Sequence, residues 1–235
     1  MKTPILIINM KEYEQVLGEK ALDFAKAAKN VLEKHDVSIL VSPPPLIFSE
    51  VADIVPAVSQ HVDPVESGSH TGAVLAEEIK KMNGVGSLIN HSEKRIPIED
   101  IKKCIELCSK YELMSIVCAQ DSEEAKKLAI YGPDFIAVEP PELIGGDVSV
   151  SNAKPEVILE TVHKVKHTSP QTEVLCGAGV KTTEDVKKAL ELGAKGVLVA
   201  SGIVKSDDVE GAIEKLVEGM LWKLVWKNSK VKSSS

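Results

Sequence analysis

The chain has few cysteines and no excess of positive charge. These two features argue against a disulfide-bonded or zinc-binding protein and against a nucleic-acid-binding protein. Its four cysteines include no Cys-x-x-Cys pair, and Cys104 and Cys108 fall one helical turn apart. This spacing argues against a disulfide framework or a zinc site, so we expect free thiols and a cytoplasmic location. Acidic residues outnumber basic ones by 35 to 28, which gives a net charge of −7. We therefore expect no nucleic-acid partner, since such a partner requires clustered positive charge.

Long apolar runs and several cofactor signatures are also missing. No stretch reaches membrane-spanning length, and the N-terminal sequence MKTPILIINMK lacks the cleavage region of a signal peptide. We therefore expect no association with a membrane. The sequence contains no metal-ligand cluster and no Gly-x-Gly-x-x-Gly dinucleotide fingerprint, which disfavours redox chemistry. We expect neither a metal nor a cofactor.

Short β-branched apolar runs alternate with longer amphipathic segments along most of the chain. The apolar runs predict eight strands, over Ile5–Asn9, Ser38–Val41, Ala57–His61, Val85–Asn90, Leu113–Ala119, Phe135–Val138, Glu173–Cys176 and Gly196–Ala200. Apolar residues at helical spacing predict the intervening helices, over Gly18–Lys34, Phe48–Ile54, Val74–Met82, Pro97–Lys110, a segment starting at Asp121, Pro155–His167, Thr182–Leu192 and Asp207–Trp222. This alternation predicts an α/β fold.

Eight strand–helix units without a linker indicate one parallel eight-stranded barrel, the (β/α)8 or TIM barrel, over residues 1–221. An open doubly wound sheet is the alternative. The remaining residues, 222–235, depart from the pattern. Trp222 and Trp226 lie one helical turn apart, which predicts a helical extension packed on the barrel or on a partner. The Ser- and Lys-rich end predicts disorder, and we expect no catalytic role for this segment.

In a parallel barrel, active-site residues lie in the loops that follow the carboxyl ends of the strands. The residues that the chain places there are Asn9, Lys11, His91, Glu93, Glu139, Gly177–Gly179 and Ala200–Gly202. Taken alone, each has an ordinary explanation, because surface lysines, structural histidines and turn glycines are common. Their position at the same end of one barrel favours a shared site.

The stretch Phe135–Ser149, FIAVEPPELIGGDVS, is the most informative of these strand ends. An apolar strand runs directly into Glu139, and Pro140-Pro141 then stiffens the chain where it leaves the strand. Gly145-Gly146 allows backbone conformations that other residues avoid. The arrangement predicts a general base beneath a closing lid. A surface glutamate ahead of an ordinary loop is the alternative.

The residue types at these strand ends suit one class of substrate. Lys11 supplies a positive charge for an anion or a developing oxyanion. His91 begins a polar segment that can open a helix, where the dipole favours the neutral imidazole, which can donate to a carbonyl oxygen. Glu139 can take a proton from the neighbouring carbon, and the glycine-rich exits of the last two strands offer N–H groups to a phosphate. These features together describe a small sugar phosphate.

Three motifs, in this order, resemble those of the triosephosphate isomerase family in its short archaeal form. They are Asn9-Met10-Lys11, Asn90-His91-Ser92-Glu93-Lys94-Arg95 and Ala137-Val138-Glu139-Pro140, and the resemblance covers about Pro4 to Leu221. It implies an isomerase of glycolysis and gluconeogenesis that interconverts dihydroxyacetone phosphate and D-glyceraldehyde 3-phosphate through an enediol(ate).

The resemblance also implies roles for individual residues. Lys11, His91 and Glu139 would be catalytic, and Glu93 would help to position Lys11. The implied substrate-binding residues are Asn9, Lys11, Ile144, Gly145, Gly179, Ala200 and Ser201.

The family is oligomeric, which implies a homo-oligomer, with a homotetramer favoured over a homodimer. The loop Val65–Gly72 would cross to a neighbouring subunit and bring Thr71 close to that subunit's Lys11 and His91. The same polar loop could instead stay in solvent.

Two rival functions remain open at this point. Another phosphate-binding barrel, such as a ribulose-phosphate epimerase or a thiazole- or indole-forming synthase, would share the glycine-rich exits without needing the three motifs. A non-catalytic barrel that binds a metabolite or serves as a scaffold is the second rival.

Overall fold

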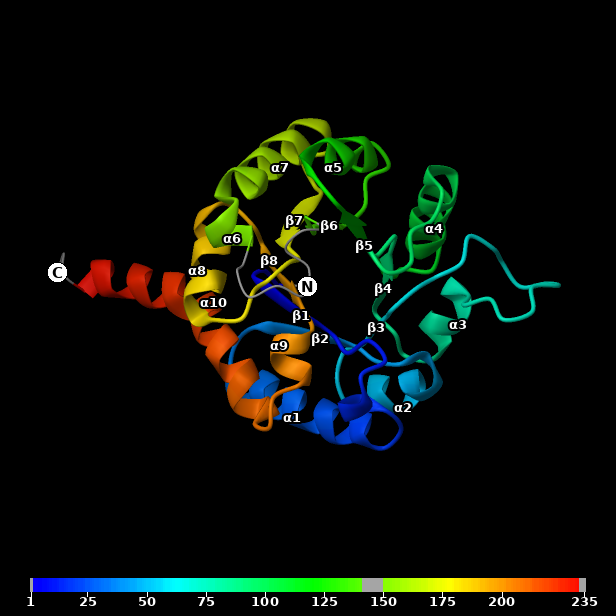
Figure 1. Ribbon diagram of the computed structural model, residues 1–235, viewed down its shortest axis with the longest axis horizontal. Coiled ribbons are helices and arrows are strands. Elements are labelled where there is room, and N and C mark those ends of the chain that lie inside the picture. The colour runs from blue at the N-terminus through cyan, green and yellow to red at the C-terminus, as the bar shows by residue number, and fades with distance from the viewer. Residues whose placement is uncertain (1, 141–149, 233–235) are drawn as a thin grey trace.

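Eight parallel strands form the centre of the molecule in the computed structural model, which describes residues 2–140 and 150–232 (Figure 1). The strands are β1 (Ile5–Asn9), β2 (Ser38–Ser42), β3 (Val58–Ser59), β4 (Gly86–Ile89), β5 (Met114–Ala119), β6 (Phe135–Val138), β7 (Glu173–Cys176) and β8 (Gly196–Val199). They pair in the order β2-β1-β8-β7-β6-β5-β4-β3. A parallel bridge between Val41 and Ala57 joins the two outer strands and completes the ring. The predicted barrel is confirmed.

Helices surround this ring on the outside (Figure 1). They are α1 (Lys20–Lys34), α2 (Phe48–Ala52), α3 (Ala76–Lys81), α4 (Ile98–Lys110), α5 (Ser122–Ala129), α6 (Val150–Ala153), α7 (Pro155–Thr168), α8 (Thr183–Glu191), α9 (Ser201–Val204) and α10 (Val209–Lys232), with the short 3-10 helices η1 (Glu14–Val16) and η2 (Pro45–Ile47). Because all the strands are parallel and each connection returns the chain to the end where the strands begin, all eight strand exits meet at the opposite end.

Strand β1 shows why the strands read as continuous apolar runs. Ile5 and Ile7 belong to the cluster that fills the barrel interior, whereas Leu6 and Ile8 belong to the layer between strands and helices. All four side chains are fully buried. Alternate residues of a strand point to opposite faces, and here both faces are covered, so an apolar residue is needed at every position.

The third strand is shorter than predicted. Pairing stops at Ser59, although the sequence predicted a strand through His61. The Ser59 hydroxyl donates to the His61 carbonyl at 2.6 Å, and the Gln60 side chain donates to the Lys11 carbonyl at 3.0 Å. These side-chain bonds hold the chain in a turn, where the apolar pattern alone suggested further strand.

The last helix includes most of the segment for which the sequence predicts a helical extension. Helix α10 runs without a break from Val209 to Lys232, and its final part points away from the ring of helices (Figure 1). Residues 233–235, for which disorder was predicted, lie outside the described residues. Among the described helices, none has the length and apolar character that crossing a bilayer would require.

Candidate functional site

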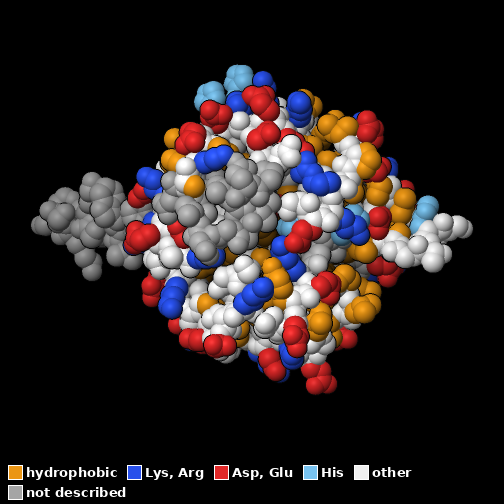
Figure 2. All heavy atoms as spheres, in the orientation of Figure 1, with side chains coloured by type: hydrophobic (Ala, Val, Ile, Leu, Met, Phe, Trp, Pro, Cys, Tyr) orange, Lys and Arg blue, Asp and Glu red, His pale blue; other side chains and the backbone are white. Residues whose placement is uncertain are grey.

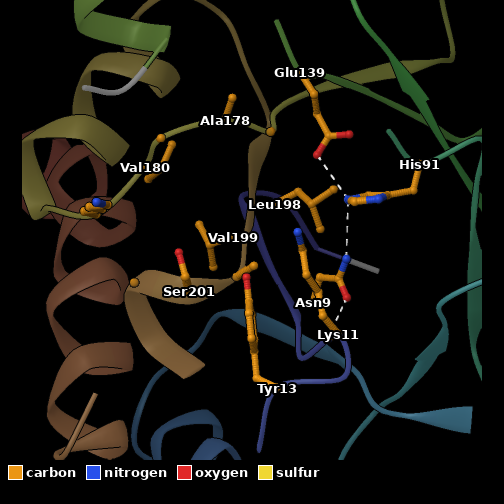
Figure 3. Close-up of a pocket in the computed structure, with 15 residues that line it drawn as sticks. Asn9, Lys11, Tyr13, His91, Glu139, Ala178, Val180, Leu198, Val199 and Ser201 are labelled. Atoms are coloured by element: carbon orange, nitrogen blue, oxygen red, sulfur yellow. Dashed lines mark hydrogen bonds and ion pairs between the residues drawn. The ribbon is translucent and has the colours of Figure 1, made fainter. Parts of the chain in front are cut away.

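A pocket lies at the carboxyl ends of five strands, with side chains from β1, β4 and β6 on one side and the exits of β7 and β8 on the other (Figure 3). The lining residues are Asn9, Lys11, Tyr13, His91, Glu139, Gly177, Ala178, Gly179, Val180, Lys181, Leu198, Val199, Ala200, Ser201 and Gly202. This is the end of the barrel at which the sequence predicted a site.

Glu139 follows directly on β6 and is almost fully buried, with 5% of its surface exposed. Its backbone N–H donates to the Ala119 carbonyl at 2.8 Å, which continues the ladder and fixes the start of the side chain. Burial raises the pKa of Glu139 to about 7, although the neighbouring Cys118 thiol and the charge of Lys11 oppose the increase. A carboxylate with this pKa can accept and release a proton near neutral pH.

The two carboxylate oxygens of Glu139 differ in their surroundings. Oε1 lies 3.7 Å from His91 Nε2. Oε2 is buried and has no hydrogen-bond partner within the described part of the chain. A buried carboxylate oxygen without a close donor is costly when the group is ionised, which agrees with the raised pKa of Glu139.

Gly177 makes room for this carboxylate. A Cβ atom at position 177 would lie 2.6 Å from Glu139 Cγ and 3.2 Å from the Val138 carbonyl oxygen. Real Cβ atoms do not approach carbon this closely, so the side chain of Glu139 can keep its position only beside a glycine. Gly177, the first residue after β7, thus leaves the space that the Glu139 side chain occupies.

His91 is held as one neutral tautomer. The backbone N–H of Glu93 donates to Nδ1 at 3.2 Å, so this nitrogen carries no proton. Burial and the nearby charge of Lys11 lower the pKa of His91, which favours the uncharged ring. A neutral ring with a bare Nδ1 carries its proton on Nε2, the nitrogen that faces Glu139 and the pocket (Figure 3).

The cause of this neutrality differs from the one that the sequence suggested. We expected a helix beginning at His91, but the chain forms a turn there, in which Lys94 N–H donates to the His91 carbonyl at 2.8 Å. The next helix, α4, begins only at Ile98. The neutral form was therefore predicted correctly, whereas its origin is burial and the Lys11 charge, not a helix dipole.

Asn9 and Lys11 complete this side of the pocket. The Lys11 N–H donates to Asn9 Oδ1 at 3.0 Å, so the amide group of Asn9 is turned toward His91, with Nδ2 3.5 Å from Nε2. Both nitrogens face the same region of the pocket, and the dashed line in Figure 3 marks the contact between them. Lys11 Nζ forms an ion pair with Glu93 Oε1 at 2.7 Å, which holds its positive charge beside these donors. The cluster is suited to an oxygen atom that gains negative charge.

The opposite side of the pocket is formed mainly by backbone. Gly179 has a φ of +71°, a conformation that L side chains rarely adopt. Helix α9 begins at Ser201 immediately after β8, and the first N–H groups of any helix lack acceptors within the helix. Free amide groups beside a glycine turn favour an anionic group such as a phosphate.

Most predicted site residues meet in this pocket. The structure brings together Asn9, Lys11, His91, Glu139, Gly179, Ala200 and Ser201. Glu93 lines an adjoining cavity that shares Asn9, Lys11 and His91. Thr71 is exposed on a loop that projects from the barrel and lines neither cavity (Figure 1). Ile144 and Gly145 lie outside the described residues.

Sequence reasoning missed three residues that shape the site. Asn90 has a φ of +62°, and its side chain bonds to Cys118 O and Ile96 N, which fixes the exit of β4. Gln60 holds the Lys11 carbonyl, and Tyr13 lines the pocket. An asparagine at a strand end was a usable signal for Asn90, whereas no local pattern identifies Gln60 or Tyr13.

Acidic and basic side chains are mixed over the face seen in Figure 2 and form no continuous basic surface there. In the part of the chain that the structure describes, no three His, Cys, Asp or Glu residues are grouped so that they could hold a metal ion.

Comparison with known proteins agrees with this geometry. A sequence profile of the triosephosphate isomerase family matches residues 4–218. The triosephosphate isomerase of Methanothermus fervidus is 46% identical over 94% of this chain and 100% of its own length. Those of Methanothermobacter thermautotrophicus and Methanocaldococcus jannaschii are each 45% identical, over 92% and 91% of this chain and 95% and 99% of their own lengths. The chain therefore belongs to the triosephosphate isomerase family.

Proposed function

We propose that the protein interconverts dihydroxyacetone phosphate and D-glyceraldehyde 3-phosphate, with Glu139 as the group that moves the proton between the two carbons. The observation that carries this proposal is a buried carboxylate with a pKa of about 7, whose Oε1 lies 3.7 Å from His91 Nε2 in a pocket that also offers anion-binding backbone. A base, a hydrogen-bond donor for a carbonyl and a phosphate site are the three groups that this isomerisation needs.

In the first step Glu139 removes a proton from C1 of dihydroxyacetone phosphate. The electrons of the C–H bond form a C1–C2 double bond, and those of the C2 carbonyl move onto its oxygen. The N–H groups of His91 and Asn9 and the ammonium of Lys11 converge on the region where this negative charge develops. Because contacts within the protein hold these donors in place, little reorganisation accompanies the reaction.

In the second step Glu139 delivers a proton to the other carbon. His91 moves a proton between the two oxygens of the enediolate, and Glu139 protonates C2, which leaves an aldehyde at C1. No atoms are gained or lost, and Glu139 ends the cycle ionised, as it began. A pKa near 7 suits both halves of this cycle, since a carboxyl group must first accept the proton and then release it.

The phosphate group is assigned to the opposite side of the pocket, at Gly179, Ala200 and Ser201. We place Ile144 and Gly145 at the part of the lid that closes over it; both lie outside the described residues. A closed lid would keep water from the enediolate, which otherwise loses phosphate. We assign the reaction to glycolysis and gluconeogenesis in the cytoplasm.

The assembly that we propose is a homotetramer, with a homodimer as the alternative. In support, the Val65–Gly72 loop projects from the barrel, and Asp63 closes its base by accepting from the Val74 N–H at 2.7 Å. In this arrangement Thr71 would approach the pocket of a neighbouring subunit. Light scattering on the purified protein tests the assembly, and a folded, fully active monomer would contradict it.

A coupled isomerase assay on the purified protein tests the function. We expect high turnover of D-glyceraldehyde 3-phosphate and a large fall for Glu139→Asp, which retracts the carboxylate from the substrate. Glu99→Asp is the matched control, since Glu99 is exposed on α4 and does not line the pocket or the adjoining cavity. Undetectable wild-type turnover would contradict the proposal and would favour a different phosphate-binding barrel or a non-catalytic one.

A further inference from the structure

Tyr13 occupies a position in the pocket that neither the motifs nor the chemistry described above explains. It follows Lys11 by two residues and lines the same pocket as Asn9, Glu139 and Ser201. In Figure 3 its ring stands on the β1 side of the pocket, and its hydroxyl end is directed toward Val199 and Ser201 at the exit of β8. The hydroxyl therefore lies on the phosphate side, although the residue comes from the loop after β1.

The backbone and the ring of Tyr13 are both held in place. Tyr13 is the residue before η1, and its carbonyl accepts from the Val16 N–H at 2.9 Å. The half-buried ring packs against the core, and Lys205 Nζ lies 4.5 Å from the ring centroid. Lys205 directly follows α9, so this cation–π contact connects the β1 loop with the helix that begins the phosphate side.

The hydroxyl itself is free for a ligand. Across the described residues, no protein atom forms a hydrogen bond with it. A phenol can donate one hydrogen bond, and a partly buried donor without a protein partner is satisfied by whatever occupies the pocket. The ammonium groups of Lys205 and Lys11 lie 4.5 and 6.0 Å from the ring centroid, so the surroundings of the hydroxyl favour an anion.

We propose that the Tyr13 hydroxyl donates a hydrogen bond to the phosphoryl group of the substrate, and that Lys205 positions the ring for this contact. The proposal rests on the proposed isomerase function for the identity of the substrate. It gives the phosphate side one side-chain donor beside the backbone amide groups of Gly179 and Ser201. Tyr13 thereby helps to select phosphorylated substrates over their unphosphorylated counterparts.

The variant Tyr13→Phe tests this role, because it removes only the hydroxyl and keeps the ring that contacts Lys205. We expect kcat/KM for D-glyceraldehyde 3-phosphate to fall about 10- to 100-fold, as for loss of a hydrogen bond to a charged group. For D-glyceraldehyde, which has no phosphate, kcat/KM should stay at the wild-type value. The matched control is Tyr131→Phe, whose half-buried ring lies outside the pocket. It should change neither value.

Two outcomes of this assay would overturn the proposal. An unchanged kcat/KM for the phosphorylated substrate would show that the hydroxyl does not contact it. Equal losses for both substrates would show that Tyr13 acts on the reacting end or on folding.

A binding measurement separates this proposal from the proposed function. Inorganic phosphate that binds the folded state raises the unfolding temperature, whether or not the protein turns over a triose. We expect a clear shift for wild type and for Tyr131→Phe, and a much smaller one for Tyr13→Phe. A Tyr13-dependent shift without any isomerase turnover would leave the phosphate contact standing and reject the proposed function. Normal turnover with equal shifts for all three proteins would reject the phosphate contact alone.

Discussion

One side of the pocket consists mainly of ionisable side chains, and the other consists mainly of backbone groups. On the reacting side, buried side chains from β1, β4 and β6 carry the chemistry, and their ionisation is set by burial and by one another. On the phosphate side, the exits of β7 and β8 present mostly backbone, shaped by a left-handed glycine and a short helix. A charged side chain can be tuned by its surroundings, whereas a backbone amide is fixed in charge and only its position can vary. Substitutions should therefore alter turnover and its pH dependence on the first side, and substrate affinity on the second.

Substitution of His91 should give the largest effect that distinguishes the reacting side of the pocket from the phosphate side. Replacing it with Gln removes the ring that points an N–H toward the developing oxyanion, so we expect kcat to fall by about 100- to 1,000-fold with a smaller change in KM. Steady-state kinetics with purified variants measures both values. His163→Gln is the control, because this histidine is exposed on α7. A large rise in KM with unchanged kcat would place His91 on the binding side instead.

Gly177 lies where the two sides meet, and its replacement should act on the reacting side. The added Cβ of Gly177→Ala would lie 2.6 Å from Glu139 Cγ and would displace the carboxylate. Displacement of a catalytic group by about 1 Å lowers turnover by about 100-fold, and we expect a loss of this size in kcat. Ser109→Ala is the control, since Ser109 is exposed on α4 and does not line the pocket. Wild-type kcat for Gly177→Ala would contradict the role of this glycine.

The pH dependence of kcat/KM should be set by the ionisation of Glu139, on the reacting side of the pocket. Glu139 accepts a proton only when it is ionised, and its pKa in the folded protein is about 7. We therefore expect kcat/KM to be highest above pH 7 and to decline by about tenfold per pH unit well below it. The affinity for inorganic phosphate, measured over the same range after correction for its own ionisation, should not follow this curve. If kcat/KM declined only near the ordinary pKa of a glutamate, the result would contradict the effect of burial on Glu139.

Much of the fold and of the reacting side could be predicted from the sequence. The strands are buried on both faces, so they read as apolar runs, and a polar residue that follows such a run marks the strand end. Lys11, His91 and Glu139 were located in this way. The third strand was overestimated because side-chain bonds at Ser59 and Gln60 replace the ladder there.

The details that sequence reasoning missed depend on three-dimensional contacts. Lys11 and Asn90 have φ values of +49° and +62°, which redirect the chain at two strand exits without any glycine to indicate it. The four-residue helix α9 is too short to show a periodic pattern. Tyr13 reaches the phosphate side from the loop after β1, where its ring meets Lys205, a residue far away in the sequence.

The central claim is that Glu139 takes a proton from carbon, and deuterium exchange tests it most directly. Wild type and Glu139→Gln are incubated with D-glyceraldehyde 3-phosphate in D2O, and the carbon-bound deuterium in substrate and product is measured by proton NMR. Because a carboxyl group exchanges its proton with solvent, we predict deuterium at C1 or C2 with wild type and none above the uncatalysed rate with Glu139→Gln. Rapid incorporation catalysed by Glu139→Gln would show that another group removes the proton, and would contradict the account.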